Sequence, residues 1–430
     1  MRSVKNNLSD RWSPRAYVVY MVALSVSLPI AFISISKLVL FTFGLTYLGY
    51  RQFRNPGNPG NGELWIFRTI LLSIFVFFSS LIWTTVEFDV AAQTLVKHSK
   101  ILTVLILIIL IRSEKEARNA LIAFAVGQTF LLASSWSLAA GLHPLWAFEL
   151  DSNGDPRGPY VVYSSYLDQS IIFATVAGIF FHLQSEKIWT PVEAWALTLA
   201  ALANVLLLLP GRTGYVIAIA VVSLAVIWLV PRRFRLSAAV AVPILVLAIL
   251  AVGSSRIRDR ISKIVTESTG FAQQTQTDNS SGWRLNAWHR SLQGIAERPV
   301  MGHGVGSWIS TVKRLEGVSA SVVFGDSNSS NPHQEYLLWG VEYGVGGTIL
   351  LVAVFFSFVK DSLAFRKPVA RATISVTVAL SVACLFNSAL YDGLVGDFFC
   401  VTLGLLMSYG LQTKLTSQEH KQQIRRNILG

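Results

Sequence analysis

A succession of long apolar stretches constrains the fold of this chain more than any other feature. The stretches recur along most of its 430 residues, and the chain is 52% hydrophobic but only 14% charged. Soluble globular chains carry about 25% charged residues. A helix that crosses the hydrocarbon core of a bilayer needs about 20 apolar residues, and several stretches reach that length once neutral flanking residues are included. The sequence therefore predicts an all-α polytopic membrane protein.

About twelve membrane spans are predicted. Pro29 interrupts the first span, and only residues 34–37 separate it from the second. The alternative is that the chain enters and leaves the membrane here as a broken pair of helices. We expect the spans at 17–33, 36–50, 64–84, 95–111, 118–141, 166–184, 190–209, 213–230, 236–252, 334–359, 372–391 and 395–412.

The net charge of +12 is distributed unevenly across this topology. With the N-terminus inside, most of the 36 basic residues fall in cytoplasmic segments, and this excess is the positive-inside pattern. It predicts that both chain ends are cytoplasmic. Basic inner loops attract anionic lipid headgroups, so membrane lipids explain the charge and no nucleic-acid partner is expected. The short outer loops hold only Lys37, Lys97, Lys100, Arg157 and Arg212.

One segment interrupts the rhythm of short loops. Residues 253–332 contain no apolar run of membrane length and lie on the outer side, between spans nine and ten. Apolar residues at helical spacing predict an amphipathic interfacial helix at 255–265. A second helix is expected at 282–297, followed by a glycine-rich turn at 301–306. Because no tandem repeat is evident, we treat residues 1–430 as one membrane domain that carries this large loop.

His333 is the candidate catalytic residue. It follows Asn331 and Pro332, which suit the cap and the first position of a helix, and Gln334 stands three residues after the cap. This pattern predicts that His333 lies in the first turn of a membrane helix at the outer surface. The positive end of the helix dipole would lower the imidazole pKa and keep a neutral base available. The alternative is an interfacial histidine that only hydrogen-bonds the loop.

Two arginines are candidates for binding phosphate. Arg212 occupies a tight outer turn, where basic residues are scarce, and its guanidinium can form bidentate bonds to phosphate. Arg284 shares one helical face with Trp288 and Ser291, at spacings of four and seven residues. The alternatives are an arginine that snorkels to lipid headgroups and an interface helix anchored by tryptophan.

Four further outer residues are secondary candidates. Arg157 follows a Gly-Asp-Pro turn, and Lys97 and Lys100 begin a span; for each of them, snorkelling is the alternative. Asp392, in the last outer turn, is expected to orient His333 or an arginine, or to cap a helix. Because no outer Asp-x-Asp pair is present, we expect no metal, and arginine side chains would stabilise the leaving group in its place.

The sequence blocks around these residues resemble the O-antigen ligase and polymerase superfamily. The resemblance covers roughly residues 60–410 and is most specific at 283–347. The blocks that carry it are Trp283-Arg-Leu-Asn-Ala-Trp, Ile295-Ala-Glu-Arg-Pro-Val-Met-Gly-His-Gly-Val-Gly-Ser-Trp, Pro332-His-Gln-Glu-Tyr-Leu, Glu342-Tyr-Gly-Val-Gly-Gly and Pro210-Gly-Arg-Thr-Gly.

The resemblance implies a GT-C-type membrane glycosyltransferase at the periplasmic face of the bacterial inner membrane. The donor would be an undecaprenyl-diphosphate-linked glycan, the acceptor lipid A-core, and no cofactor is implied. By motif, His333 matches the catalytic histidine, Arg212 and Arg284 match the conserved arginines, and Asp392 matches a late outer aspartate. The chain departs from the family at Gln334, because the family often has asparagine after the histidine.

Two rival functions stay open from the sequence. A polymerase of the same superfamily would use the same donor but another lipid-linked glycan as acceptor; polymerases often have two comparable outer loops, whereas this chain has one. A transporter or flippase would place substrate groups near the bilayer midplane. Charges within the spans are few here, with Glu342 the main candidate.

Overall fold

The computed structural model describes residues 13–54, 64–148, 158–186, 188–253, 280–317 and 331–429. All regular elements within these residues are helices, which confirms the prediction of an all-α polytopic membrane protein. By length and mean hydropathy, nine of the described helices are able to cross a membrane, or ten if one bent pair is a single span. The count of about twelve and the GT-C-type architecture stay predictions.

The chain runs through its helices in a simple order. The first half contains α2 (Pro14–Ser25), α3 (Ile30–Arg54), α4 (Trp65–Ser79), α5 (Phe88–Ser99), α6 (Leu102–Leu110), α7 (Glu114–Ala139), α8 (Tyr166–Leu183) and α9 (Pro191–Ala203). The second half contains α10 (Arg212–Leu229), α11 (Arg235–Gly253), α13 (Ser280–Glu297), α14 (Trp308–Glu316), α16 (Glu335–Ser362), α17 (Lys367–Phe386) and α18 (Gly393–Leu429).

The predicted span at 17–33 is wrong in its bounds. Helix α2 has only 12 residues and ends at Ser25, and α3 begins at Ile30, directly after Pro29. Proline has no backbone N–H to donate, and its ring disfavours a helical conformation for the residue before it. A helix of this length rises about 18 Å, less than the hydrocarbon core of a bilayer. The alternative of a broken segment at this end of the chain therefore describes the structure better.

The predicted span at 95–111 is also divided. It comprises the end of α5 and all of α6, and the two helices are bent by 43° at a break between Ser99 and Leu102. Lys100 lies in this break and is buried. Polar residues at 97–100 precede an apolar run at this point, and hydropathy alone does not show whether such a junction bends a helix.

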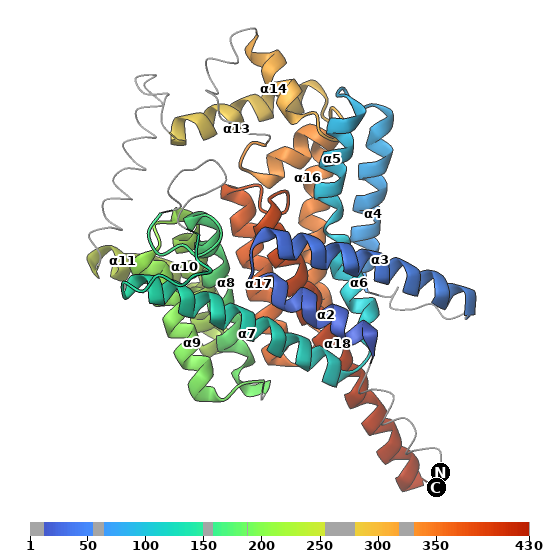
Figure 1. Cartoon of the computed structure of the whole chain (residues 1–430), viewed down its shortest axis with the longest axis vertical. Helices are drawn as coiled ribbons and strands as arrows, with labels where there is room; N and C mark the ends of the chain where they lie inside the picture. Colours follow the sequence, from blue (N-terminus) through green and yellow to red (C-terminus); the bar gives the residue numbers. More distant parts are fainter. Residues whose placement is uncertain are drawn as a thin grey trace.

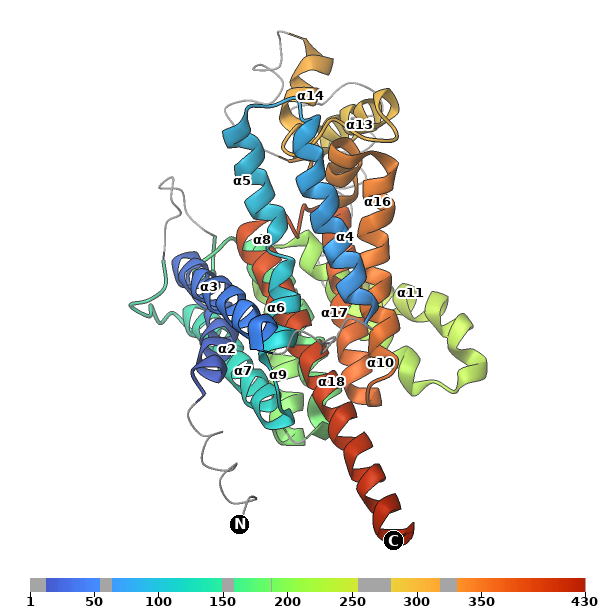
Figure 2. The ribbon, with the colours of Figure 1, turned by 90° about the vertical axis from the view of Figure 1, so that its right-hand side faces the viewer.

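The two helices of the large loop lie together. Figure 1 shows α13 and α14 across one end of the bundle, opposite the end at which α18 finishes. Figure 2 shows α4, α5 and α16 side by side beneath them. The predicted helix at 282–297 corresponds to α13, whereas the interfacial helix predicted at 255–265 lies outside the described residues.

The glycine-rich turn at 301–306 attaches this loop to the bundle. Helix α16 is kinked at Gly344, whose backbone, with φ of 72° and ψ of −171°, is not helical. In the turn, the backbone N–H groups of His303 and Gly304 each donate, at 2.9 Å, to carbonyl oxygens just before the kink. Buried backbone carbonyls need partners, so the turn and the kink satisfy each other.

Candidate functional site

Basic and acidic side chains meet where several helices begin. Tyr166 and Arg212 are the first residues of α8 and α10, and Asp392 immediately precedes α18. Electrostatic interactions connect Arg284 with Arg212 and Tyr166, and connect His333 with Arg284 and Asp392. Helix N-termini carry partial positive charge and backbone N–H donors, which favour anions. The structure therefore brings the predicted histidine, both principal arginines and the predicted aspartate into one neighbourhood.

His333 lies before α16 rather than in its first turn, so that part of the prediction is wrong. The helix begins at Glu335 with Gln334 as its N-cap, and His333 has a left-handed backbone with φ of 50°. Asn331 does not cap the helix; its side-chain Oδ1 accepts the His333 backbone N–H at 2.9 Å. Asparagine side chains commonly compete with helices for nearby backbone donors in this way. A non-glycine residue with this backbone is strained and must be held by its surroundings.

Helix α13 supplies one of the groups that hold this segment. The Trp288 indole Nε1–H donates to the backbone oxygen of Pro332 at 3.0 Å. On the same helical face, the Ser291 hydroxyl accepts the Nε1–H of Trp308 at 2.8 Å. The face that carries Arg284 thus contacts the segment around His333 as well as α14.

The His333 ring is held by a residue that sequence reasoning missed. His333 Nδ1 and Asn387 Oδ1 are 3.1 Å apart, and Asn387 is a buried residue directly after α17. Burial is the main cause that lowers the pKa of His333, and Arg284 lowers it further, whereas the contacts with Asn387 and Asp392 oppose this shift. A half-buried imidazole that stays neutral suits a general base.

The two arginines form a cluster of like charge. Arg212 and Arg284 are both half-buried and interact electrostatically. Burial and then the charge of Arg212 lower the pKa of Arg284, although a guanidinium remains protonated at any ordinary pH. An anion between the two groups would relieve both the burial of charge and the repulsion. The cluster thus has the charge and the donors that a diphosphate requires.

Close packing fixes the position of Arg212. A five-residue π-helical segment, Asn204–Leu208, leads into the turn before α10. A Cβ on Gly211 of that turn would lie 2.0 Å from the Ser170 hydroxyl oxygen, and one on Gly214, in the first turn of α10, would lie 2.5 Å from the Ser170 Cβ. Only glycine lets α8 and α10 approach this closely, so these two glycines set where Arg212 stands.

Asp392 acts as a helix cap. Its Oδ1 accepts the backbone N–H of Val395 at 3.5 Å in the first turn of α18, and burial raises the pKa of Asp392. It also interacts electrostatically with Asp168 of α8. Of the three roles expected for Asp392, capping is the one for which the structure gives a hydrogen bond; Asn387 contacts the ring of His333.

The two lysines contact the turn that carries Asp392. The buried Lys100 Nζ donates to the backbone oxygens of Tyr391, at 3.3 Å, and of Asp392. The exposed Lys97 places its Nζ 3.3 Å from the Tyr391 hydroxyl and 4.3 Å from the centre of that ring. These contacts give both lysines a role in supporting the turn between α17 and α18.

Glu335 supports the same turn from α16 and was also missed from the sequence. Its fully buried carboxylate accepts backbone N–H groups from Leu390 at 3.0 Å and Tyr391 at 3.1 Å, and the indole N–H of Trp339 at 2.9 Å. A buried carboxylate is stable only with such partners. The family-like block that begins at Pro332 contains this residue, but nothing in the block indicates a partner 55 residues away.

Two of the predicted residues have no described role in the site. Arg157 lies outside the described residues. Gln334 is the N-cap residue of α16, and its side chain forms no capping hydrogen bond. A role for Gln334 in the chemistry stays a prediction.

Glu342, the main charged candidate within a span, is held by protein groups. Its carboxylate lies 2.8 Å from His98 Nε2 and accepts the backbone N–H of Gly306 at 2.9 Å. The rings of Phe77, Trp339 and Tyr343 surround His98. These contacts connect α5, α16 and the glycine-rich turn, so Glu342 contributes to the attachment of the large loop.

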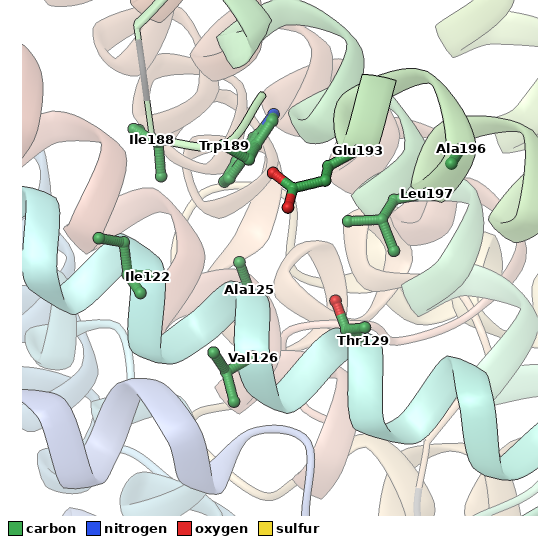
Figure 3. Close-up of a pocket in the computed structure, with 9 residues that line it drawn as sticks. All are labelled: Ile122, Ala125, Val126, Thr129, Ile188, Trp189, Glu193, Ala196 and Leu197. Carbon is green, nitrogen blue, oxygen red and sulfur yellow. The ribbon is translucent and has the colours of Figure 1, made fainter. Parts of the chain in front are cut away.

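A cleft of about 430 Å³ lies elsewhere, between α7 and α9 (Figure 3). It is lined mainly by apolar side chains, with Glu193 and Leu197 from the first two turns of α9. Arg212 follows the far end of the same helical segment. The carboxylate of Glu193 is engaged by the backbone N–H of Thr190 at 2.7 Å. None of the residues that line the cleft belongs to the neighbourhood of His333.

The comparison with protein families finds a match in the central part of the chain. Residues 197–352 match the family model described as O-antigen ligase. The matched segment runs from α9 into α16 and includes Arg212, Arg284 and His333, whereas Asn387 and Asp392 follow it. No curated protein sequence matches the chain.

Proposed function

We propose that the chain is a member of the O-antigen ligase and polymerase superfamily, because residues 197–352 match the O-antigen ligase family model. From this premise we propose that the protein is a ligase that transfers O-antigen polysaccharide from undecaprenyl diphosphate to the lipid A-core oligosaccharide. The observation that carries the proposal is the neighbourhood of Arg212, Arg284 and His333, in which two guanidinium groups adjoin a half-buried imidazole. A diphosphate leaving group needs the first feature, and a hydroxyl nucleophile needs the second.

The proposed reaction is a single displacement. His333 takes the proton of an acceptor sugar hydroxyl, and the oxygen forms a bond to the anomeric carbon of the donor. The bond from that carbon to the diphosphate oxygen breaks, and the diphosphate departs with the electron pair. Arg212 and Arg284 balance the negative charge that develops on it. Attack from the side opposite the leaving group inverts the anomeric configuration.

The proposed orientation puts the site at the periplasmic face of the bacterial inner membrane. It rests on the excess of basic residues in the loops at the other ends of the spans. Helices α13 and α14 then cover the periplasmic end of the bundle, where a lipid-linked donor and the lipid A-core acceptor both present their sugars. The end of α18, with Lys414 and Lys421, is cytoplasmic in this orientation.

The ligase is favoured over the two rivals by separate features. One long segment lies between α11 and α16, which suits a ligase better than a polymerase with two comparable outer loops. Transport would need charged groups near the midplane for the substrate, yet Glu342 is occupied by His98 and a backbone N–H. The first feature favours lipid A-core as the acceptor, and the second argues against transport.

The test is a transfer assay with the purified full-length protein. It receives lipid-linked glycan donor together with either lipid A-core or a second lipid-linked glycan, with and without a chelator. Transfer to lipid A-core is expected, and His333→Ala should lower it by about 10²- to 10⁴-fold, the usual contribution of a general base. The matched control is His289→Ala, because His289 is exposed on α13.

Each other outcome has a defined meaning. Transfer only to the second lipid-linked glycan would identify a polymerase. Movement of the donor across the membrane without a new glycosidic bond would identify a transporter. Unchanged transfer by His333→Ala would exclude the proposed base.

A further inference from the structure

The contact between the side chains of His333 and Asn387 bears on which ring nitrogen of His333 carries a proton. Asn387 Oδ1 lies 3.1 Å from His333 Nδ1, and the backbone N–H of Ser388 donates to the same Oδ1 at 3.1 Å. Asn387 is 4% exposed and its backbone is extended, with φ of −153°, directly after the last turn of α17. One side-chain atom is therefore shared by a backbone group and an imidazole.

The backbone N–H decides which atom of the amide this is. The oxygen and nitrogen of an asparagine amide are told apart by their hydrogen-bonding partners. The N–H of Ser388 can only donate, so the atom 3.1 Å from it must be the amide oxygen. That oxygen has two lone pairs and accepts a second hydrogen bond. The donor of the second bond is His333 Nδ1, which must then carry a proton.

A neutral imidazole with its proton on Nδ1 has its lone pair on Nε2. We infer that Asn387 is a positioning residue that holds His333 in this tautomer, so that Nε2 is the atom that accepts the proton of the acceptor hydroxyl. The inference rests on the proposed function and adds to it the reacting atom and the group that selects it.

The proton balance follows from the same geometry. When Nε2 takes the hydroxyl proton, the ring becomes an imidazolium, and its Nδ1–H still donates to Asn387 Oδ1. The new oxygen–carbon bond forms as the bond from carbon to diphosphate breaks. After the products leave, Nε2 releases its proton to water and the first tautomer is restored. The ring keeps its orientation throughout the cycle.

A neutral amide has a different effect from the carboxylate that often orients a catalytic histidine. Arg284 on α13 disfavours the imidazolium, and Asp392 before α18 favours it. Arg284 also interacts with Arg212, and Asp392 with Asp168 and Lys100. Asn387 adds no charge to this set. An aspartate in its place would stabilise the imidazolium and raise the pKa of His333.

Two substitutions of Asn387 separate orientation from charge. Asn387→Ala removes the acceptor from both Ser388 and His333. Asn387→Asp keeps an acceptor oxygen of similar size and adds a negative charge. Both variants, with the wild-type protein, His333→Ala and the control Asn119→Asp, are assayed as full-length protein in lipid nanodiscs. The Asn119 amide donates to Tyr20, at 3.5 Å, so this control adds a carboxylate without touching His333.

The expected results differ for each variant. Asn387→Ala should lower kcat by about 10²-fold, a substantial part of what general-base catalysis contributes, with little change in the KM for the donor. Asn387→Asp should recover most of kcat at alkaline pH, and the acid limb of its pH–rate profile should move to higher pH. Asn119→Asp should reproduce the wild-type profile.

The outcomes that overturn the inference are distinct from those that overturn the proposed function. An Asn387→Ala variant with wild-type kcat, beside an inactive His333→Ala, would refute the positioning role and leave the base in place. If Asn387→Ala does not fold, Asn387→Asp decides alone, because an acid limb identical to that of the wild type would refute the contact. Full activity of His333→Ala would instead refute the proposed function itself.

Discussion

Arg212 and His333 each lie in a turn that contains proline, and the two turns are held in place in different ways. Arg212 belongs to the first turn, is the first residue of α10 and has Gly211 as its N-cap. No hydrogen bond to a side chain caps this helix. Instead, Gly211 and Gly214 pack on Ser170, at distances that leave no room for a Cβ. Steric contact between two helices sets the place of Arg212.

His333 belongs to the second turn and stands outside a helix with a left-handed backbone. Three side chains hold the segment: Asn331 accepts its N–H, Trp288 donates to the carbonyl before it, and Asn387 accepts from its ring. Hydrogen bonds from α13, the turn itself and the end of α17 thus replace close packing.

The difference matches what each group has to do. A guanidinium keeps its charge, so a fixed position close to the diphosphate is sufficient. An imidazole that exchanges a proton also needs a defined tautomer, which only hydrogen bonds can select. The backbone strain at His333, of about 1–3 kcal/mol for such a conformation, is the cost of that arrangement. The first turn should therefore be sensitive to added volume and the second to lost donors and acceptors.

Among the substitutions that test this difference between the two turns, the largest effect is expected from added volume in the first turn. In Gly211→Ala, the new Cβ would meet the Ser170 Oγ at 2.0 Å and its Cβ at 2.8 Å, so α10 must move away from α8. Overpacking of this kind costs about 1–3 kcal/mol of stability. A displacement of Arg212 by about 1 Å should lower transfer by about 10²-fold. Melting temperature in detergent and the transfer assay measure the two effects.

A second substitution tests whether the contact with Ser170 is the cause. In Gly211→Ala combined with Ser170→Gly, both close atoms are gone and the nearest remaining atom is the Tyr166 carbonyl oxygen at 3.2 Å. Transfer and stability should recover in large part. The control is Gly49→Ala, because nothing lies within 4 Å of a Cβ there. A double variant as impaired as Gly211→Ala would contradict the packing explanation.

A smaller effect is expected from a lost donor in the second turn. Trp288→Phe keeps an aromatic ring but removes the Nε1–H that donates to Pro332 at 3.0 Å. A neutral hydrogen bond contributes about 1 kcal/mol net, so kcat should fall by about fivefold. The matched control is Trp136→Phe, which loses a similar bond to the Ala200 carbonyl, at 3.2 Å, between α7 and α9. Equal loss of activity in the two variants would mean that the bond to Pro332 has no special role.

The sequence was sufficient for the spanning helices because apolar runs report directly on burial in lipid. The span expected at 166–184 is α8, and that expected at 213–230 is α10 within one residue. It was not sufficient for the break within the span predicted at 95–111, since polar residues at 97–100 do not by themselves indicate a bend between two helices.

The limits at the candidate site have a similar physical origin. The motif around Asn331 indicated a helix cap, but the Asn331 side chain accepts the His333 N–H instead, and the helix begins only at Glu335. Asn387 ends an apolar helix, where a polar residue is unremarkable, and its contact with His333 spans 54 residues of sequence. Residue types that perform chemistry can be found from a motif, whereas the neutral groups that orient them are found only from contacts between distant elements.

The smallest effect is expected in the pH dependence, and only the second turn should show it. His333 must be neutral to accept a proton, so transfer should fall as the pH decreases through its pKa, which burial and Arg284 hold below the ordinary 6.5. A guanidinium group stays charged throughout this range. Arg284→Gln removes a positive charge that disfavours the imidazolium, so the acid limb should move to higher pH. Arg284→Lys keeps the charge, and its acid limb should stay near that of the wild type.

Both variants weaken binding of the donor, so each profile is compared with its own plateau at alkaline pH. An acid limb that is the same in both variants would show that the charge of Arg284 does not reach His333, and the two turns would then act as separate units.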